Sequence, residues 1–436
     1  MCQQCIFGLG DDVFDAHGID GDVLAAGGTI GIPYDTDPTD ADQGVDALIR
    51  GRAWDTSDLT FSFPASRSDF ETSYINLDGI EDDDGNPIIS ELTAQQKAAV
   101  YQQLDEIEGF SPLTFSERGG AGTGQRIEGA LRYVRSDDPS TAYAYYPSTN
   151  NVGGDSFYNH ALGLKHGHDT AYGGAIPAAQ DSMEYSVMTY RSFAGSSLGG
   201  YTNETWGFAQ SFMMLDIAAI QRLYGADFAH NAGDTVYSVS PSTGEVFAGA
   251  ESLGLPGANR VFRTIWDGGG TDTYDFSNYS ADLAIDLAPG GFVDLDVGGN
   301  YQRARLGGGE YARGHIFNAL RHEGDARSLI ENAIGGSGND TLSGNAADNT
   351  LAGGLGDDLL STSPGTDFFR GGAGSDTVSF ASSVAAHGFS LVDGVLEVTE
   401  SFTARIEDTV EWLAFPDQTL SYADALALAP VPDDYS

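Results

Sequence analysis

The sequence GGSGNDTLS, residues 335–343, begins a nine-residue repeat, and four further units start at residues 344, 353, 362 and 371. In every unit the sixth residue is Asp or Asn and the eighth is apolar. The sixth positions are Asp340, Asn349, Asp358, Asp367 and Asp376, and the eighth positions are Leu342, Leu351, Leu360, Phe369 and Val378. A partial copy lies upstream at residues 267–274.

This repeat predicts a parallel β-roll in which each unit is a tight turn followed by a short strand. The glycines allow positive φ, the aspartates supply the hard oxygen ligands that calcium prefers, and the apolar residue points inward. A flexible linker rich in Gly and Asp is the alternative, but a linker has no need of a repeated apolar position. Without calcium the turns hold carboxylates that repel one another, so we expect the roll to be largely unfolded. The second and fourth units lack glycines at residues 346–347 and 362–364, and their sites are expected to be weak or empty.

Composition narrows the class of protein. The 436 residues include 64 acidic and 20 basic side chains, a formal net charge of −44. This charge repels nucleic acid and anionic membranes. With 41% hydrophobic and 11% aromatic residues the chain can build packed cores, which argues against a disordered acidic chain. No window approaches the ~18 apolar residues of a membrane span.

We expect three parts along the chain: a tail or short pro-segment at 1–43, an α+β region at 44–228 and an all-β region at 229–436. Thr93 and Gln96 form a capping-box pattern before a helix, and a second helix over 213–224 is expected to end at Gly225. Strands are expected at residues 59–64, 114–116, 130–134 and 142–146. The apolar positions of the first helix are Ala98, Val100, Tyr101, Leu104 and Ile107.

The N-terminus contains the only two cysteines, Cys2 and Cys5. They form a CxxC pair without the βαβ context of a redox site, so we interpret the pair as incidental. The first residues lack a basic start and a long apolar stretch, and no Sec signal is expected there.

Two histidines, His160 and His166, flank Gly163 in the segment NHALGLKHGHD, residues 159–169. A helix that carries His160 and breaks at Gly163 brings both imidazoles toward one metal ion. The segment YSVMTY, residues 185–190, follows with Met188 in a turn. A single histidine is more often structural, but this combination favours a metal site.

These segments resemble those of the serralysin-type metzincins, zinc endopeptidases that carry a calcium-binding RTX β-roll. HALGLKH at 160–166 resembles the second half of the zinc motif HExxHxxGxxH, and SVMTY at 186–190 resembles the Met-turn with its tyrosine. The segments at 216–226, 265–273 and 330–336 are also similar to the family, and the resemblance covers roughly residues 44–380. It implies an α+β metzincin-like protease domain at 44–228, followed by an all-β parallel β-roll (RTX) domain at 229–436.

By this resemblance, His160 is the second zinc ligand, His166 is the third, and Met188 forms the floor of the zinc site. Tyr190 binds zinc at rest and swings to stabilise the oxyanion. The resemblance also implies calcium ligands in a paired-loop site at the entrance of the roll and in the roll itself. The entrance ligands are Asn231, which stands where the family has an arginine that ligates through its carbonyl, Gly233, Thr235, Asp267, Gly269 and Asp272. The roll ligands are Glu331, Gly336, Gly338, Asp340, Gly354, Gly356, Asp358 and Asp376.

The chain departs from the family pattern just before His160. The first zinc histidine and the general-base glutamate belong four and three residues earlier, where this chain has Ser156 and Phe157. An internal deletion is the simplest explanation. A catalytic zinc takes three protein ligands and a water, and loss of a general base typically costs ~10²–10⁴-fold in rate. The side chains considered as substitutes are His168, Asp169, Tyr190 and Glu184.

The resemblance implies a secreted, monomeric zinc endopeptidase stabilised by several calcium ions, which acts on extracellular proteins or peptides. Export by type I secretion would read an uncleaved C-terminal segment, here residues 413–436. Three hypotheses stay open. The first is an active zinc endopeptidase with a substitute ligand. The second is an inactive scaffold that binds peptides or a proteinaceous inhibitor, and the third is a calcium-assembled structural or surface protein.

Overall fold

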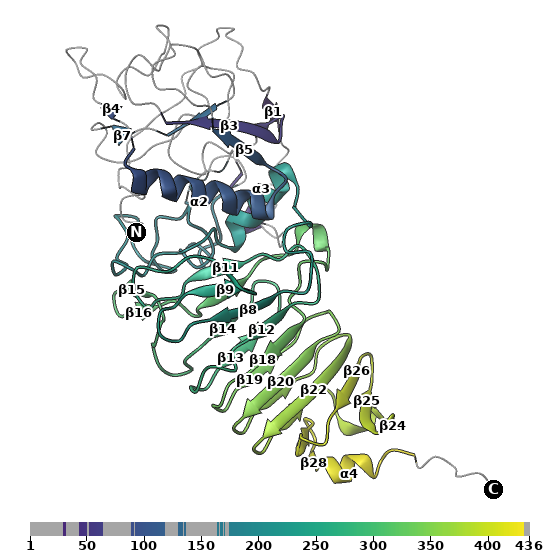
Figure 1. Ribbon diagram of the computed structural model, residues 1–436. Coiled ribbons are helices and arrows are strands. Elements are labelled where there is room, and N and C mark those ends of the chain that lie inside the picture. The colour runs from purple at the N-terminus through teal and green to yellow at the C-terminus, as the bar shows by residue number, and fades with distance from the viewer. Residues whose placement is uncertain are drawn as a thin grey trace. The chain divides into compact units, whose positions relative to one another are not determined.

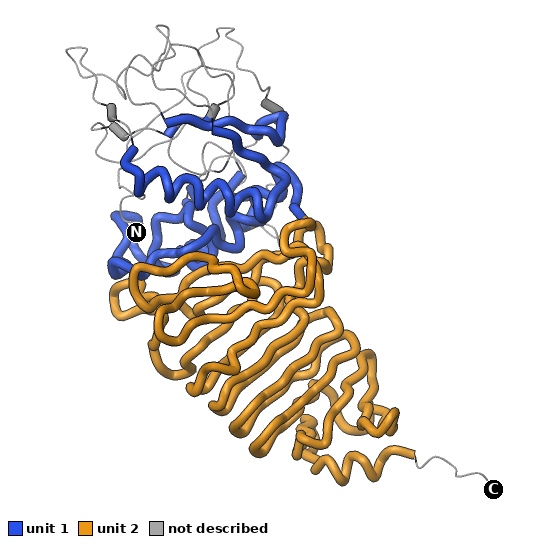
Figure 2. The backbone as a smooth tube through the Cα atoms, in the orientation of Figure 1, with its two compact units in different colours: residues 1–227 blue, residues 228–436 orange. Residues whose placement is uncertain are grey.

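A computed structural model describes residues 29–31, 43–49, 52–63, 89–90, 92–117, 130–133, 135–136, 164, 166–168, 170 and 174–430. The chain divides into two compact units, Met1–Asp227 and Phe228–Ser436 (Figure 2). The expected strand at 142–146 lies outside the described residues.

The first unit combines helices with short strands. A parallel sheet has the strand order β5-β3-β6, and β1–β2 and β4–β7 are antiparallel pairs. The strands are β1 (Thr29–Gly31), β2 (Arg52–Trp54), β3 (Asp58–Ser62), β4 (Ile89–Ser90), β5 (Thr114–Glu117), β6 (Ala130–Arg132) and β7 (Arg135–Ser136). The helices are α1 (Gln43–Asp46), α2 (Ala94–Phe110) and α3 (Met214–Tyr224).

Helix α2 begins as its sequence predicts. The Gln96 N–H donates to Thr93 Oγ1 at 3.3 Å, and the Thr93 N–H donates to Gln96 Oε1 at 2.9 Å, so the capping box is confirmed. Val100, Leu104 and Ile107 are buried along one face. Tyr101 differs from these positions, because it is 38% exposed and its hydroxyl donates to Glu117 at 2.6 Å.

Helix α3 ends where expected. Gly225 follows its last residue with φ of 95°, a conformation that favours glycine, and its N–H donates to the Gln221 carbonyl at 2.7 Å. The helix is buried on most of its surface, including the charged residue Asp216.

The second unit is almost entirely β-structure. Its early strands are β8 (Val236–Val239), β9 (Val246–Ala248), β10 (Glu251–Ser252), β11 (Arg263–Ile265), β12 (Thr273–Asp275), β13 (Ala284–Asp286), β14 (Phe292–Asp294), β15 (Arg305–Gly307), β16 (Glu310–Tyr311) and β17 (Ile316–Asn318). Its later strands are β18 (Asn332–Ile334), β19 (Thr341–Ser343), β20 (Thr350–Leu355), β21 (Leu359–Ser361), β22 (Thr366–Ala373), β23 (Thr377–Ser379), β24 (Gly388–Val392), β25 (Val395–Thr399), β26 (Thr403–Ile406), β27 (Trp412–Ala414) and β28 (Thr419–Ser421). A last helix, α4, spans Tyr422–Leu426, and 3₁₀ turns lie at His322–Gly324 and Val384–Ala386.

These strands form two large sheets. One has the order β10-β9-β8-β12-β18-β20-β22-β26-β25-β24, and the other has the order β11-β17-β14-β13-β19-β21-β23-β27-β28. Successive repeats alternate between the sheets, so that β12, β18, β20 and β22 lie beside one another in parallel (Figure 1). The register pairs residues 18 apart, as in Leu342 with Leu360 and Leu360 with Val378. Two nine-residue units therefore make one coil, and the predicted parallel β-roll is confirmed.

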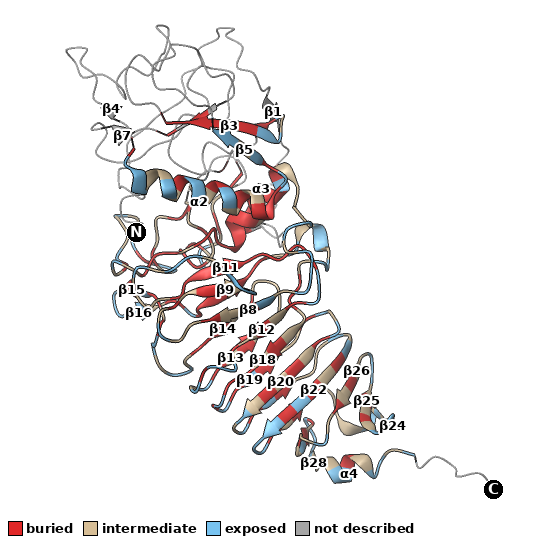
Figure 3. Cartoon of the chain, in the orientation of Figure 1, coloured by how far each residue is buried: buried red, intermediate tan, exposed pale blue. Residues whose placement is uncertain are grey.

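The core of the roll is built from the eighth residue of each repeat. Leu342, Leu351, Leu360, Phe369 and Val378 are all 0% exposed, and buried residues follow the strands in Figure 3. The partial copy behaves alike, because Tyr274 is also 0% exposed. The repeat therefore supplies one inward side chain per strand from each sheet.

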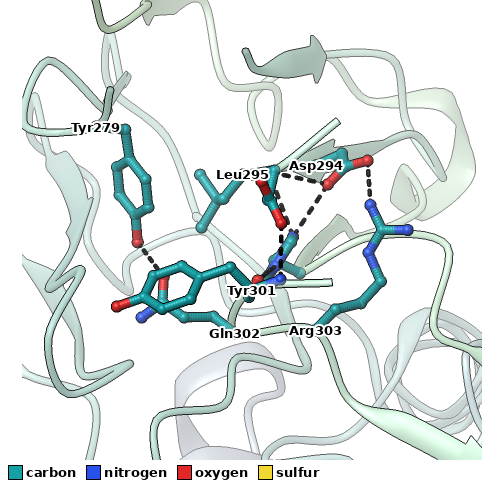
Figure 4. Close-up of polar contacts among 8 residues, drawn as sticks. Tyr279, Asp294, Leu295, Tyr301, Gln302 and Arg303 are labelled. Atoms are coloured by element: carbon teal, nitrogen blue, oxygen red, sulfur yellow. Dashed lines mark hydrogen bonds and ion pairs between the residues drawn. The ribbon is translucent and has the colours of Figure 1, made fainter. Parts of the chain in front are cut away.

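A buried polar cluster supports the loop between β14 and β15 (Figure 4). His315 is 0% exposed; its Nδ1 accepts the Leu295 N–H at 3.0 Å, and its Nε2 lies 2.8 Å from the Tyr301 carbonyl oxygen. Nε2 therefore carries the proton, and burial lowers the pKa of this imidazole. Asp294 pairs with Arg303 beside it. A neutral histidine thus holds two points of the loop together beside an ion pair. The cluster lies in the segment between the partial repeat and the regular repeats.

The inward position of Leu360 can be tested by truncation. Leu360→Ala is expected to lower the free energy of unfolding in saturating calcium by about 2–5 kcal/mol, because a fully buried side chain is replaced by a cavity. The adjacent Leu359 is 39% exposed, so Leu359→Ala is the matched control and should change stability by no more than about 0.5 kcal/mol. Urea unfolding followed by circular dichroism measures both, and equal losses would contradict the assigned register.

Candidate metal centres

The turn at residues 186–190 is held by one buried carboxylate, that of Asp216 on helix α3. Asp216 Oδ1 accepts the Ser186 hydroxyl at 2.6 Å, and Oδ2 accepts the Val187 N–H at 2.8 Å. Oδ2 also accepts the Met213 N–H at the start of the helix at 3.0 Å. Burial raises the pKa of Asp216 to about 6, and the three hydrogen bonds act against that rise. The carboxylate thus joins the helix to the turn.

Met188 lies in this turn and is 7% exposed. Its carbonyl accepts the Gly167 N–H at 3.0 Å, which fixes the loop that carries His166 and His168. A Cβ on Gly167 would lie 2.5 Å from Ile176 Cδ1, so only glycine fits between the two histidines without a shift. The methionine turn and the histidine loop are therefore in direct contact and hold each other in place.

Three aromatic side chains meet above the turn. The Tyr190 hydroxyl lies 3.0 Å from His166 Nε2. The centre of the His168 ring is 4.8 Å from that of Tyr190 and 5.6 Å from that of His166. His168 Nδ1 is buried and has no hydrogen-bond partner. An orphaned imidazole nitrogen beside a histidine and a phenol fits a metal such as zinc, which binds nitrogen and oxygen donors.

The other residues expected at the zinc site are placed as follows. His160 lies outside the described residues, as do Ser156, Phe157 and Asp169. Glu184 is described and buried. Within the described ranges, no three His, Cys, Asp or Glu side chains come together as a metal-binding group. The described part of the site therefore offers two imidazoles and one phenol.

In the second unit, the structure brings the expected entrance residues into one pair of loops. The Thr235 N–H donates to Asp272 Oδ1 at 2.7 Å, and a Cβ on Gly270 would lie 2.7 Å from the carbonyl oxygen of Gly233. The Asp272 N–H in turn donates to Glu331 Oε2 at 2.7 Å. Asp272 Oδ2 is buried without a hydrogen-bond partner. Close carbonyl groups and an orphaned carboxylate oxygen fit a calcium ion.

Asp267, also in this pair of loops, is held by Tyr237, a residue that the sequence pattern did not indicate. Tyr237 donates its hydroxyl to Asp267 Oδ2 at 2.6 Å, and Asn231 Nδ2 donates to the Tyr237 oxygen at 3.2 Å. The Gly269 N–H donates to Asp267 Oδ1 at 2.9 Å. Tyr237 is the inward residue of β8, and no repeat pattern marks it as a partner of a carboxylate.

Along one edge of the roll, the aspartates of the odd repeats form a ladder. The Asp340 N–H donates to Asp358 Oδ1, and the Asp358 N–H donates to Asp376 Oδ1, both at 2.8 Å. The second oxygens of Asp358 and Asp376 are buried without hydrogen-bond partners. The Asp376 N–H donates to Glu411 Oε2 at 2.7 Å, so Glu411 ends the ladder. Sequence reasoning missed Glu411, because the hairpin of β24 and β25 interrupts the repeat before it.

The glycine turns of this edge stack closely on one another. A Cβ on Gly354 would clash with the carbonyl of Gly336, and one on Gly356 would clash with that of Gly338. Gly354 and Gly356 have φ of 114° and 110°. The expected roll ligands other than Glu331 therefore lie along this edge, with glycine required at two positions of the turn. Glu331 lies instead beside Asp272 and Asn349.

Burial raises the pKa of the carboxyl groups at these sites. The pKa rises to about 6 for Asp340 and to about 7 for Asp358 and for Glu331. For Asp267 and Asp272 burial is again the largest cause of a raised pKa. These groups retain protons at a pH where exposed carboxyls have lost them, unless a cation takes the place of the proton.

Comparisons with known proteins bear on both units. Residues 226–307 match the family described as Peptidase M10 serralysin C terminal. Residues 328–360 and 343–378 match the RTX calcium-binding nonapeptide repeat.

Curated relatives extend these matches. The chain is 33% identical to metallopeptidase AprA of Pseudomonas marginalis over 327 residues, which cover 67% of this chain and 61% of that protein. It is 31% identical to metalloprotease AprA of Pseudomonas entomophila over 349 residues, which cover 71% and 65%. With serralysin G of Dickeya chrysanthemi it shares 32% identity over 247 residues, 49% of this chain and 45% of the relative.

Together these matches define a metalloprotease-type chain with RTX repeats. The chain is similar to serralysin-type metalloproteases, and its second unit carries a serralysin C-terminal type of domain and RTX calcium-binding repeats, so the expected resemblance is confirmed. It spans less than two thirds of the length of the relatives named above. In the part of the chain that the structure describes, no helix is both long and apolar enough to cross a bilayer.

The role of Asp216 as an anchor predicts a large effect of a nearly isosteric change. Asp216→Asn places an N–H₂ group among three donors, so the free energy of unfolding of the first unit should fall by about 1–3 kcal/mol. The exposed Asp55→Asn is the control and should have little effect. Urea unfolding and near-ultraviolet circular dichroism measure the change, and unaltered stability in Asp216→Asn would contradict the anchoring role.

The raised pKa values predict that acid stabilises the calcium-free roll. A carboxyl with a raised folded-state pKa favours the folded state below its unfolded pKa, near 4, and this contribution is lost as pH rises toward 6 or 7. The melting temperature of calcium-stripped protein should therefore be higher at pH 5 than at pH 7.5, by at least about 2–4 °C. Saturating calcium should abolish this preference for acid. A calcium-free roll that melts higher at pH 7.5 would contradict the burial of these groups.

Proposed function

We propose that this chain is a secreted, calcium-assembled zinc endopeptidase whose catalysis is strongly attenuated. The observation that carries the proposal is the Tyr190 hydroxyl 3.0 Å from His166 Nε2, above a methionine turn anchored by Asp216. Similarity to metallopeptidases over 67% and 71% of the chain supports the reaction class. Export by type I secretion accords with the RTX repeats and is part of the same proposal.

In this proposal His166, His168 and Tyr190 hold the zinc ion, and His160 is a further ligand. His168 takes the place of the missing first histidine, because its Nδ1 is buried and unpartnered beside the other two side chains. When bound, zinc supplies Lewis acidity toward the scissile carbonyl and toward a water molecule.

Two further roles fall to protein side chains: stabilising the charge that develops on the carbonyl oxygen, and accepting a proton from water. Tyr190 would hold the zinc ion at rest and swing away when substrate binds, and its hydroxyl would then donate a hydrogen bond to the oxygen of the reacting carbonyl, which stabilises the charge that develops there. The glutamate that would accept a proton from water is absent from its expected position, which Phe157 occupies. Its loss lowers the expected rate by about 10²–10⁴-fold relative to an intact site.

The second candidate function is a scaffold that binds peptides or a proteinaceous inhibitor without cleaving them. Ser156 and Phe157 favour it, because neither a first zinc histidine nor a general base stands there. Both candidates require the calcium-folded roll, but they differ in turnover.

Metal analysis and casein digestion on one calcium-refolded sample test the proposal. We expect about one zinc per chain and slow digestion that a zinc-selective chelator stops. His166→Ala and His168→Ala should each weaken zinc binding by at least about tenfold, while His230→Ala, an exposed histidine of the second unit, should leave it unchanged.

Two other outcomes would decide against the proposal. Zinc binding with intact casein would favour the scaffold. Calcium without zinc would overturn the zinc centre and leave a calcium-assembled binding or structural protein.

A further inference from the structure

The two edges of the roll satisfy their carboxyl oxygens in different ways. The first edge includes the turns at 335–340, 353–358 and 371–376, and the second edge ends in the turns at 344–349 and 362–367. On the first edge, Asp358 Oδ2 and Asp376 Oδ2 are buried without hydrogen-bond partners. On the second edge, the corresponding side chains are Asn349 and Asp367, and neither has an orphaned oxygen.

Ser363 accounts for this difference. Its hydroxyl lies 2.8 Å from Asp367 Oδ2 and 3.1 Å from Asn349 Oδ1, so its one proton is within reach of the sixth residues of two successive turns. The Ser363 N–H also donates to Asp367 Oδ2 at 3.1 Å. A bound ion would have to approach these same two oxygens.

The backbone of the turn agrees with the side chains. Ser363 occupies the second position of its repeat, where Gly354 and Gly372 have φ of 114° and 118°. Ser363 does not adopt a positive φ, which a residue with a Cβ reaches only at a cost. Gly336, at the same position of the first turn, has no positive φ either, so this backbone difference separates Ser363 from Gly354 and Gly372 only.

Next to these two turns, side-chain amides donate hydrogen bonds to backbone carbonyl oxygens. Asn349 Nδ2 donates to the Glu331 carbonyl at 2.9 Å, and Asn345 Nδ2 donates to the Ile330 carbonyl at 2.8 Å. Asn349 Oδ1 accepts the Asn345 N–H at 2.7 Å. These oxygens already have partners and gain less from a cation than the orphaned oxygens of the first edge.

We propose that the Ser363 hydroxyl takes the place of a calcium ion between the turns at 344–349 and 362–367. Hydrogen bonds satisfy the side-chain oxygens between these two turns of the second edge, so no metal is needed there, while the first edge needs cations. The calcium content of the roll is therefore lower than its number of stacked turns indicates, and calcium binding is uneven between the two edges. This inference is independent of the zinc centre.

A matched pair of substitutions tests the proposal in the full-length protein. Ser363→Gly removes the hydroxyl and restores the glycine that permits positive φ, so it should open a calcium site. Ser363→Ala also removes the hydroxyl but keeps the Cβ, so it should not. The calcium ions bound per chain are counted by native mass spectrometry and by isothermal titration with calcium alone.

We expect Ser363→Gly to bind one calcium more than the wild type, and Ser363→Ala to bind the wild-type number. Without calcium both variants should melt below the wild type, and calcium should raise the melting temperature most in Ser363→Gly. Equal calcium counts in wild type and Ser363→Gly would overturn the proposal. An added calcium in Ser363→Ala would also support the proposal, because loss of the hydroxyl alone would then admit the ion.

Discussion

The stability of the folded roll depends on carboxylates that stack at 18-residue intervals. Asp340, Asp358 and Asp376 succeed one another along one edge, and each backbone N–H serves the next carboxylate. Those bonds satisfy one oxygen and leave others buried without partners. A chain with 64 acidic and 20 basic residues has few cationic side chains to place there. Protons or calcium ions must therefore complete the turns, and at neutral pH calcium is the stronger partner.

The nine-residue period was sufficient to predict the interior of the roll. Within the five repeats, each strand pairs with the strand 18 residues away. Residue identity at the eighth position thus determined which side chains are buried. Tyr237 and Glu411 could not be found in this way, because each reaches its aspartate across a segment that does not repeat.

In the first unit, local patterns predicted the elements better than the site. The capping box at Thr93 and the stop at Gly225 depend on neighbours three or four residues away, which the sequence displays directly. Asp216 joins its helix to a turn 30 residues earlier in the chain, and no spacing rule reveals that contact. The meeting of His166 and His168 with Tyr190 likewise depends on a tertiary hydrogen bond, from Gly167 to Met188.

The last coil of the roll is closed by segments that are not repeats. Strand β26 pairs in parallel with β22 and antiparallel with β25, and Glu411 receives the final N–H of the aspartate ladder. In a solenoid each coil touches only its neighbours, so order propagates along one dimension, as in a zipper. An uncovered terminal coil would present a strand edge to other chains. Here the hairpin and Glu411 cover the terminal coil, so the same contacts oppose both fraying of the last strands and pairing with another chain.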